Sequence, residues 1–265
     1  MPPRRNADGD FPYWLILLAG IGLYLFWRVA TDGLYAQVLA TLAKGIWITV
    51  FVTLVAYAMA SALGLGLALA AGSRFIVLRQ VARFYVEVMR GIPIIVLLLY
   101  VAFVLAPGLV AGWNWATGWT GLPPVTTRDF PLLWRAVIAL TLAYAAFLAE
   151  IFRAGLQSVD PGQIEAAEAL GLGRWQRFRH IVFPQAFRTI LPPYGNDFVA
   201  MVKDSSLVSV LGVTDITQLG KVTAAGNFRY FETYNVVALI YLTMTVTLSL
   251  GLRRVEARLR RGGRG

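Results

Sequence analysis

The chain has 265 residues, of which 58% are hydrophobic and only 14% are charged. A soluble domain of ordinary composition has about 45–50% apolar and about 25% charged residues, because its surface needs a polar shell. The composition therefore argues against a soluble enzyme, a disordered chain and a nucleic-acid-binding domain. It predicts an integral membrane protein.

The basic character of the chain fits this prediction. The formal net charge is +10 at pH 7, and basic residues of membrane proteins collect on the cytoplasmic face. We therefore expect membrane lipid, and not nucleic acid, as the partner of this charge. The chain has no cysteine and one histidine, His180. This excludes thiolate and multi-histidine metal sites, and no metal site is expected.

Six apolar stretches have about the length of a transmembrane helix, which needs roughly 20 residues. They lie at 13–30, 44–72, 92–110, 132–152, 190–212 and 235–252. We predict an all-α, polytopic membrane protein with six transmembrane helices. The first stretch is expected to be a retained anchor and not a cleaved signal, because its apolar region is long and five more spans follow. Residues 1–40 then form the N-terminal tail and first helix, 41–259 the main transmembrane domain, and 260–265 a basic tail.

The distribution of arginines predicts the orientation of these spans. Most of the 24 basic residues fall in the N-terminal tail, in the segments around 74–90 and 153–189, and after residue 252. If every span crosses, these segments share one side, which the positive-inside rule assigns to the cytoplasm together with both termini. The outer loop 111–131 carries Trp113, Trp115 and Trp119 and is expected to lie at the level of the lipid headgroups.

The third cytoplasmic segment, about 153–189, predicts a helix–turn–helix. Asp160 is a good N-cap, and Pro161 suits the first helical position. Gly171 and Gly173 end this helix, and we expect Gly171 to adopt the left-handed conformation that glycine reaches at low cost. A second, basic and amphipathic helix is predicted to start at Arg174 and to end near residue 183. The alanines of the first helix leave room for the close approach of a partner surface.

The spacing within this segment resembles a known motif. The EAA signature of ABC importer permeases is similar to the run Glu165-Ala166-Ala167, then Gly171, Ile181 and Phe183-Pro184. Four further segments resemble permeases for polar amino acids of the histidine/glutamine/arginine type: RGIP at 90–93, AEIFRAGLQSV at 149–159, PQAFRTILPP at 184–193 and KDSSLVSVLGV at 203–213. The resemblance covers roughly residues 45–259. It implies the five-helix core of a type I importer, to which the first span is additional.

The resemblance implies the permease subunit of an importer that moves polar L-amino acids across the bacterial inner (cytoplasmic) membrane. Its partners would be an ABC ATPase dimer, a second permease that is identical or related, and an extracytoplasmic amino-acid-binding protein. No cofactor is expected on this chain, which has no G-x-x-x-x-G-K-[ST] phosphate loop, so ATP and Mg would bind the ATPase subunits. The residues implied in coupling to the ATPase are Glu165, Ala166, Ala167, Gly171, Arg174, Ile181 and Pro184.

Polar residues within the apolar stretches are the candidates for a substrate pathway. Glu150 ends the fourth span, and it either contacts the α-amino group of a passing amino acid or pairs with Arg153 one turn away. The fifth span is broken by Pro192-Pro193 and holds the candidates Asn196, Asp197, Lys203, Asp204 and Ser205. These residues either line the pathway or form an internal Lys–Asp network, and Ser205 either binds substrate or caps the backbone at the break.

A different class of function remains as the alternative. An intramembrane enzyme would use Glu150, Asp197 and Asp204 as acid and base groups. The sequence shows no arrangement of nucleophile and base, however, and an enzyme leaves the EAA-like segment unexplained. Co-purification of an ATPase subunit would separate the two hypotheses.

Overall fold

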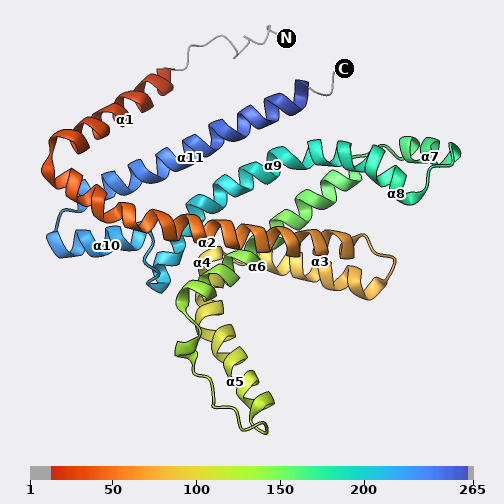
Figure 1. The fold of residues 1–265 in the computed structure, drawn as a ribbon, viewed down its shortest axis with the longest axis horizontal. Coiled ribbons are helices and arrows are strands. Elements are labelled where there is room, and N and C mark those ends of the chain that lie inside the picture. The colour runs from red at the N-terminus through yellow and green to blue at the C-terminus, as the bar shows by residue number, and fades with distance from the viewer. Residues whose placement is uncertain (1–12, 262–265) are drawn as a thin grey trace, which may run out of the picture.

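The computed structural model describes residues 13–261, and Figure 1 shows that this part of the chain is built from helices. The α-helices are α1 (Tyr13–Thr31), α2 (Gly33–Ala71), α3 (Ile76–Gly91), α4 (Ile94–Tyr100), α5 (Ala106–Thr117), α6 (Leu132–Gln157), α7 (Pro161–Ala169), α8 (Arg174–Arg177), α9 (Phe183–Asp204), α10 (Ile216–Asn227) and α11 (Tyr230–Arg261). Two π-helical segments, η2 (Val101–Leu105) and η4 (Phe178–Val182), and two 3₁₀ segments, η3 (Thr127–Asp129) and η5 (Ser205–Leu211), complete the helical elements of the described residues.

Four helical segments among the described residues are long and apolar enough to cross a bilayer. They are Gly33–Ala71, Ile94–Thr117, Leu132–Gln157 and Tyr230–Arg258. Each contains or overlaps one of the predicted spans, and α1 coincides with the predicted stretch 13–30. The all-α, polytopic fold predicted from the composition is therefore confirmed.

The central element of the bundle is α6. In the most apolar stretch of 18 residues in α6, 67% of the residues are buried, whereas 17% are buried in the corresponding stretch of α11. Small residues allow α2 to approach it closely, since a Cβ on Gly64 would lie 2.9 Å from the carbonyl oxygen of Ala145. Near the C-terminal end of α6, the absence of a side chain at Gly155 leaves room for Ile190 of α9. The helices that carry the candidate functional residues, α6 and α9, are thus packed directly against each other.

The fifth predicted span differs from the structure in its start and in its break. Pro192 and Pro193 do not open a helix but lie inside α9, which begins at Phe183 and follows η4 without an intervening turn. Prolines inside a helix are tolerated where neighbouring helices pack against it, and here α2 contacts the residue that follows the pair. The Tyr57 hydroxyl donates to the carbonyl of Tyr194, and the hydroxyls of Tyr194 and Ser61 lie 2.9 Å apart. The helical break falls instead at η5.

The predicted second cytoplasmic helix is also part of this longer element. It was expected to end near residue 183, but α8, η4 and α9 follow one another with helical backbone throughout. A continuous helical segment therefore runs from Arg174, beside the turn that follows α7, to Asp204 in the bundle.

The outer loop 111–131 is partly helical and is ordered by two polar side chains. α5 includes Trp113 and Trp115, and Figure 1 shows it projecting away from the rest of the bundle. The Asn114 side chain makes hydrogen bonds of 2.8 and 2.9 Å with both backbone groups of Val125. Hydrogen bonds from the backbone and hydroxyl of Thr126 hold the pKa of Asp129 below its usual value. The exposed tryptophans are thus displayed on an ordered arm.

A buried arginine joins this arm to the bundle, because a proline has left a carbonyl without a donor. In η2 the N–H of Ala106 binds the carbonyl of Val101, five residues back. The next residue, Pro107, has no N–H to give to the carbonyl of Ala102. Arg135 supplies the missing donor, with its Nη1 3.0 Å from that oxygen.

The same guanidinium also donates to two carbonyls of the outer loop. Its Nε lies 2.8 Å from the oxygen of Phe130, and its Nη2 donates to Thr127. Arg135 is only 6% exposed. One side chain thereby satisfies three backbone acceptors and fixes the loop between α5 and α6 against the π-helical segment.

Replacing Arg135 with leucine should lower the free energy of unfolding by about 1–3 kcal/mol, because the Ala102 carbonyl would be buried without a donor. Thermal unfolding of the purified protein in detergent measures the change. The matched control is Arg128→Leu in the same loop, where the side chain is exposed and a change within about 0.5 kcal/mol is expected. Equal stability of the two variants would contradict the role given to Arg135.

Candidate coupling and translocation site

The loop that was predicted to be cytoplasmic begins with a capped helix, as expected. The Asp160 carboxylate accepts a hydrogen bond of 2.7 Å from the N–H of Gly162, and Pro161 occupies the first position of α7. The cap satisfies a helical donor that would otherwise be unpaired, and the proline has none to lose. The start of α7 is therefore determined by adjacent residues alone.

The end of α7 is a Schellman turn centred on Gly171. This glycine has a φ of +78°, so the predicted left-handed conformation is confirmed. The N–H of Leu172 binds the carbonyl of Ala167 at 3.0 Å, and the N–H of Gly171 binds that of Glu168 at 2.9 Å. These two bonds close the last turn of the helix. A Cβ at Gly171 would meet no atom within 4 Å, so only the backbone conformation restricts this position.

Two side-chain contacts connect α7 to the long helical segment α8–η4–α9. Arg177 and Glu168 form an ion pair of 3.0 Å, in which the arginine side chain is 16% exposed. Gln185 of α9 donates to Gln163 of α7 at 2.6 Å. Figure 1 shows α7 and α8 together at one extremity of the molecule. The loop is therefore a compact projection tied to α9, and not a flexible linker.

The residues of the EAA-like segment differ in their exposure. Glu165, Ala166, Arg174 and Pro184 are exposed, Ile181 is half-buried, and Ala167 is buried. Two neighbours that the sequence analysis did not select are the most exposed apolar side chains of this projection: Leu170 is 79% and Trp175 is 68% exposed. The signal that would have found them is an apolar residue beside a helix-ending glycine at the tip of a polar loop.

Glu150 makes the ion pair that was one of its two predicted roles. Arg153 Nη2 lies 2.6 Å from a carboxylate oxygen of Glu150, and the two side chains are 41% and 35% exposed. The pair lines a cavity of about 290 Å³ between α2, α3 and α6. Arg83 and Glu87 of α3 line the same cavity. The structure thus gathers two guanidinium groups and two carboxylates around one space, which the sequence did not indicate.

Among the residues that the structure describes, Asp204 is the polar candidate on α9 with a side-chain hydrogen bond. The Tyr144 hydroxyl of α6 donates to Asp204 at 2.7 Å. Asp197 is half-buried and interacts electrostatically with Tyr57 and Tyr144. Ser205 is fully buried and donates to the carbonyl of Val202 at 2.8 Å, which is the backbone-capping role.

Two candidates, Asn196 and Lys203, lie on the exposed surface of α9. Within residues 13–261 the ion pairs join other residues, so the internal Lys–Asp network considered from the sequence does not form around Lys203. A lysine at membrane depth is costly unless a partner or water meets it. Among the described residues, no side chain is recorded as a partner of Lys203 or Asn196.

Comparison with known proteins agrees with this geometry. The family model of the binding-protein-dependent transport system inner membrane component matches residues 62–261. Among curated proteins, the chain is 38% identical to the probable amino-acid permease protein YxeN of Bacillus subtilis over 212 residues, which cover 79% of this chain and 87% of YxeN. It is 36% identical to the glutamine transport system permease protein GlnP of Escherichia coli over 183 residues, or 68% and 75% of the two chains.

Solved structures show the same arrangement of helices. A chain from the crystal structure of an amino acid ABC transporter with histidines has a TM-score of 0.71 and 34% identity, and the match covers 84% of this chain and 96% of that one. A chain of the MetNI methionine ABC transporter in an inward-facing conformation has a TM-score of 0.63 at 20% identity, over 82% and 95% of the two chains. The second likeness concerns the fold alone.

The bundle and its projecting loop therefore define a transporter subunit and not an enzyme. This chain belongs to the family of binding-protein-dependent transport system inner membrane components. It is a permease subunit of an ABC importer, and this class works with ATPase and binding-protein partners.

Proposed function

We propose that this chain is the permease of an importer of polar L-amino acids in a bacterial inner membrane, with both termini in the cytoplasm. It would pair with a second permease, identical or related, above an ATPase dimer that binds ATP and Mg, and receive substrate from an extracytoplasmic binding protein. The observation that carries the proposal is the capped α7 loop, which projects from the bundle and is tied to α9. The names of relatives that transport glutamine and arginine support the substrate class.

The connection between α7 and α9 suggests how ATPase movement reaches the membrane. The exposed α7 surface, with Leu170 and Trp175 beside it, would sit on the ATPase. Because Glu168–Arg177 and Gln163–Gln185 fix α7 to the continuous helix α8–η4–α9, a displacement of α7 would move α9 as a rigid body. A flexible loop would absorb the same displacement.

The exposed polar face of α9 is proposed to line the translocation pathway. Asn196 and Lys203 would face the second permease across a space that water enters, which removes the cost of an unpartnered lysine in the bilayer. Asp197 and Asp204 lie on the adjacent face of α9, where the tyrosine contacts to α6 limit their movement. Movement of α9 would then change the pathway directly.

The charged cavity around Glu150 is proposed as a contact site for the amino acid. Its two arginines and two glutamates match the carboxylate and the ammonium group of a zwitterion, and its volume of about 290 Å³ suits a small molecule. In this proposal the substrate ammonium displaces Arg153 from Glu150. The exchange costs little, because a half-exposed ion pair contributes only about 0–1 kcal/mol.

Two substitutions at Gly171 distinguish the effect of its backbone conformation from the effect of adding a side chain. Gly171→Val should reduce coupling, because a β-branched residue in the left-handed region costs about 1–2 kcal/mol or more and would open the Schellman turn. Gly171→Asn is the matched control, since asparagine tolerates this conformation. The measurement is uptake per ATP hydrolysed by the reconstituted transporter. Full coupling in the valine variant would refute the role of the turn.

Glu150→Gln should lower transport about ten-fold or more while the complex still assembles, because a hydrogen bond to a charged group contributes about 1.5–3 kcal/mol. Substrate-concentration dependence of uptake, together with recovery of the ATPase after purification, measures both effects. The control is Glu232→Gln, which removes a carboxylate from another pair three residues apart, between Glu232 of α11 and Arg229 just before that helix. Loss of assembly in Glu150→Gln alone would assign the residue a structural role.

The proposed pathway is testable by labelling, since the chain has no cysteine. Asn196→Cys should react with a water-soluble thiol reagent in the assembled transporter, and added substrate should slow the reaction. Met201→Cys, at a fully buried position of the same helix, should stay unlabelled. If the thiol of the Asn196→Cys variant did not react, this face of α9 would not be open to water.

The composition of the complex is tested by isolating the tagged permease from membranes in mild detergent. Mass spectrometry of the co-purifying chains should find an ATPase with a phosphate loop and an amino-acid-binding protein. The number of permease sequences found distinguishes a homodimer from a heterodimer. Isolation of this chain alone, under conditions that keep a known importer assembled, would contradict the proposal.

A further inference from the structure

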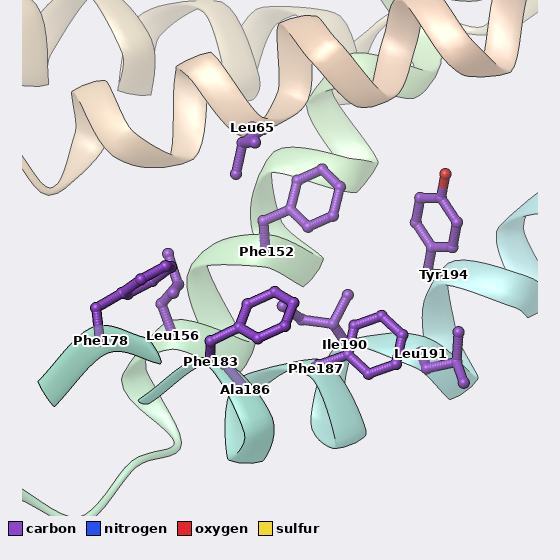
Figure 2. A pocket seen from close by; sticks show the side chains of 10 residues that line it. All are labelled: Leu65, Phe152, Leu156, Phe178, Phe183, Ala186, Phe187, Ile190, Leu191 and Tyr194. Atoms are coloured by element: carbon purple, nitrogen blue, oxygen red, sulfur yellow. The ribbon is translucent and has the colours of Figure 1, made fainter. Parts of the chain in front are cut away.

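An apolar groove of about 370 Å³ lies where α2, α6 and α9 meet. Figure 2 shows the side chains around it, with Phe152 on one side and the rings of Phe183 and Phe187 on the other. The lining side chains are apolar except for the hydroxyl of Tyr194, which already contacts Ser61. A ligand that fills this groove must therefore offer hydrocarbon and not hydrogen-bonding groups.

The wall formed by η4 and α9 is a row of aromatic rings. Centroid distances are 5.7 Å from Trp175 to Phe178, 5.9 Å from Phe178 to Phe183 and 5.8 Å from Phe183 to Phe187. The three phenylalanine rings of the groove remain partly open, since Phe178 is 38%, Phe183 is 51% and Phe187 is 40% exposed. This row begins beside the cytoplasmic loop and continues along α9 into the bundle.

Unpaired arginines border the aromatic row. Arg179 directly follows Phe178, and Arg188 directly follows Phe187. Both are exposed, and the ion pairs of residues 13–261 include neither, whereas Arg177 pairs with Glu168. Successive helical residues differ by about 100°, so these arginines lie at the edge of the aromatic face. Their long side chains can reach a phosphate at the membrane surface while their stems stay beside the rings.

The combination of a hydrocarbon groove and neighbouring cations identifies one class of occupant. We propose that the groove holds an acyl chain of an anionic phospholipid of the cytoplasmic leaflet, with its phosphate on Arg179 and Arg188. Basic pockets between helices on this side of a membrane bind such headgroups. The placement on the cytoplasmic leaflet rests on the orientation proposed above for the α7 loop.

A protein occupant fits the observations less well. A soluble ATPase surface would have to place hydrocarbon inside the membrane-spanning bundle. A second copy of this chain is itself strongly basic, with 24 lysines and arginines against 14 acidic residues, and so offers little to balance Arg179 and Arg188. An anionic lipid supplies both the hydrocarbon and the negative charge.

The bound lipid would contact the helix that connects the cytoplasmic loop to the bundle. η4 carries Phe178, and it lies between α8 and α9. A lipid chain packed against Phe178, Phe183 and Phe187 would support this segment where α9 enters the membrane. The transporter is therefore expected to couple ATP hydrolysis to uptake better in bilayers that contain anionic lipid.

The direct test is photo-crosslinking in the complete transporter, reconstituted in bilayers. The probes are phosphatidylglycerol and phosphatidylcholine, each with a diazirine on one acyl chain, and the crosslinked peptides are mapped by mass spectrometry. Phosphatidylglycerol should label residues 152–156 and 178–194, with each arginine contributing a preference of about five-fold, the factor that corresponds to about 1 kcal/mol per basic residue. Arg179→Gln/Arg188→Gln should abolish this preference, while Arg128→Gln in the outer loop should leave it unchanged.

The possible outcomes separate this proposal from the transport function. Equal labelling by the two lipids, or a preference that survives Arg179→Gln/Arg188→Gln, would overturn the headgroup assignment. Absence of lipid from the groove, with Phe187→Cys crosslinking to an ATPase or a second permease, would show a protein occupant and overturn the proposal. Uptake measured in the same bilayers tests the transport function independently, because the crosslinking result does not depend on which substrate is carried.

Discussion

Inside the hydrocarbon core of a membrane, every backbone N–H and C=O must find a partner without help from water, and the architecture of the spans follows from that requirement. Helices meet it along most of the described chain. Where Pro107 interrupts the ladder of hydrogen bonds, a side chain from another helix supplies the donor, because Arg135 donates to the carbonyl of Ala102. Next to Pro192-Pro193, Tyr194 of α9 contacts Tyr57 and Ser61 of α2. These contacts also fix the 111–131 loop and α9 in place.

The helical continuity between α8 and α9 connects the α7 loop rigidly to the bundle. A helix that ended at Phe183 would leave the loop and the membrane part free to move separately. Because α8, η4 and α9 join without a turn, the ion pair and the glutamine contact of α7 act on one long helix. In the proposed mechanism this helix carries both the ATPase contact and the polar face of the pathway. The proposed lipid site lies along the same segment.

Local residue patterns predicted the features that depend on neighbours in the sequence. The apolar stretches predicted the transmembrane fold. Asp160 and Pro161 predicted the start of α7, and Gly171 predicted its end. The same rules failed at Pro192-Pro193, where they predicted the start of a helix. A packed bundle tolerates prolines inside a helix, and the residue after this pair, Tyr194, contacts Tyr57 and Ser61, which lie more than a hundred positions away in the chain.

The sequence by itself determined the membrane class, the capped loop around α7 and the family, because composition, capping and motif spacing can be recognised without knowing the tertiary structure. Only the tertiary structure decided which polar groups meet. It joined Glu150 with Arg83 and Glu87 around one cavity, attached Asp204 to Tyr144, and left Lys203 without a partner within the described residues. Such encounters depend on how α2, α3, α6 and α9 cross one another, and the crossing is decided by packing at positions such as Gly64 and Gly155.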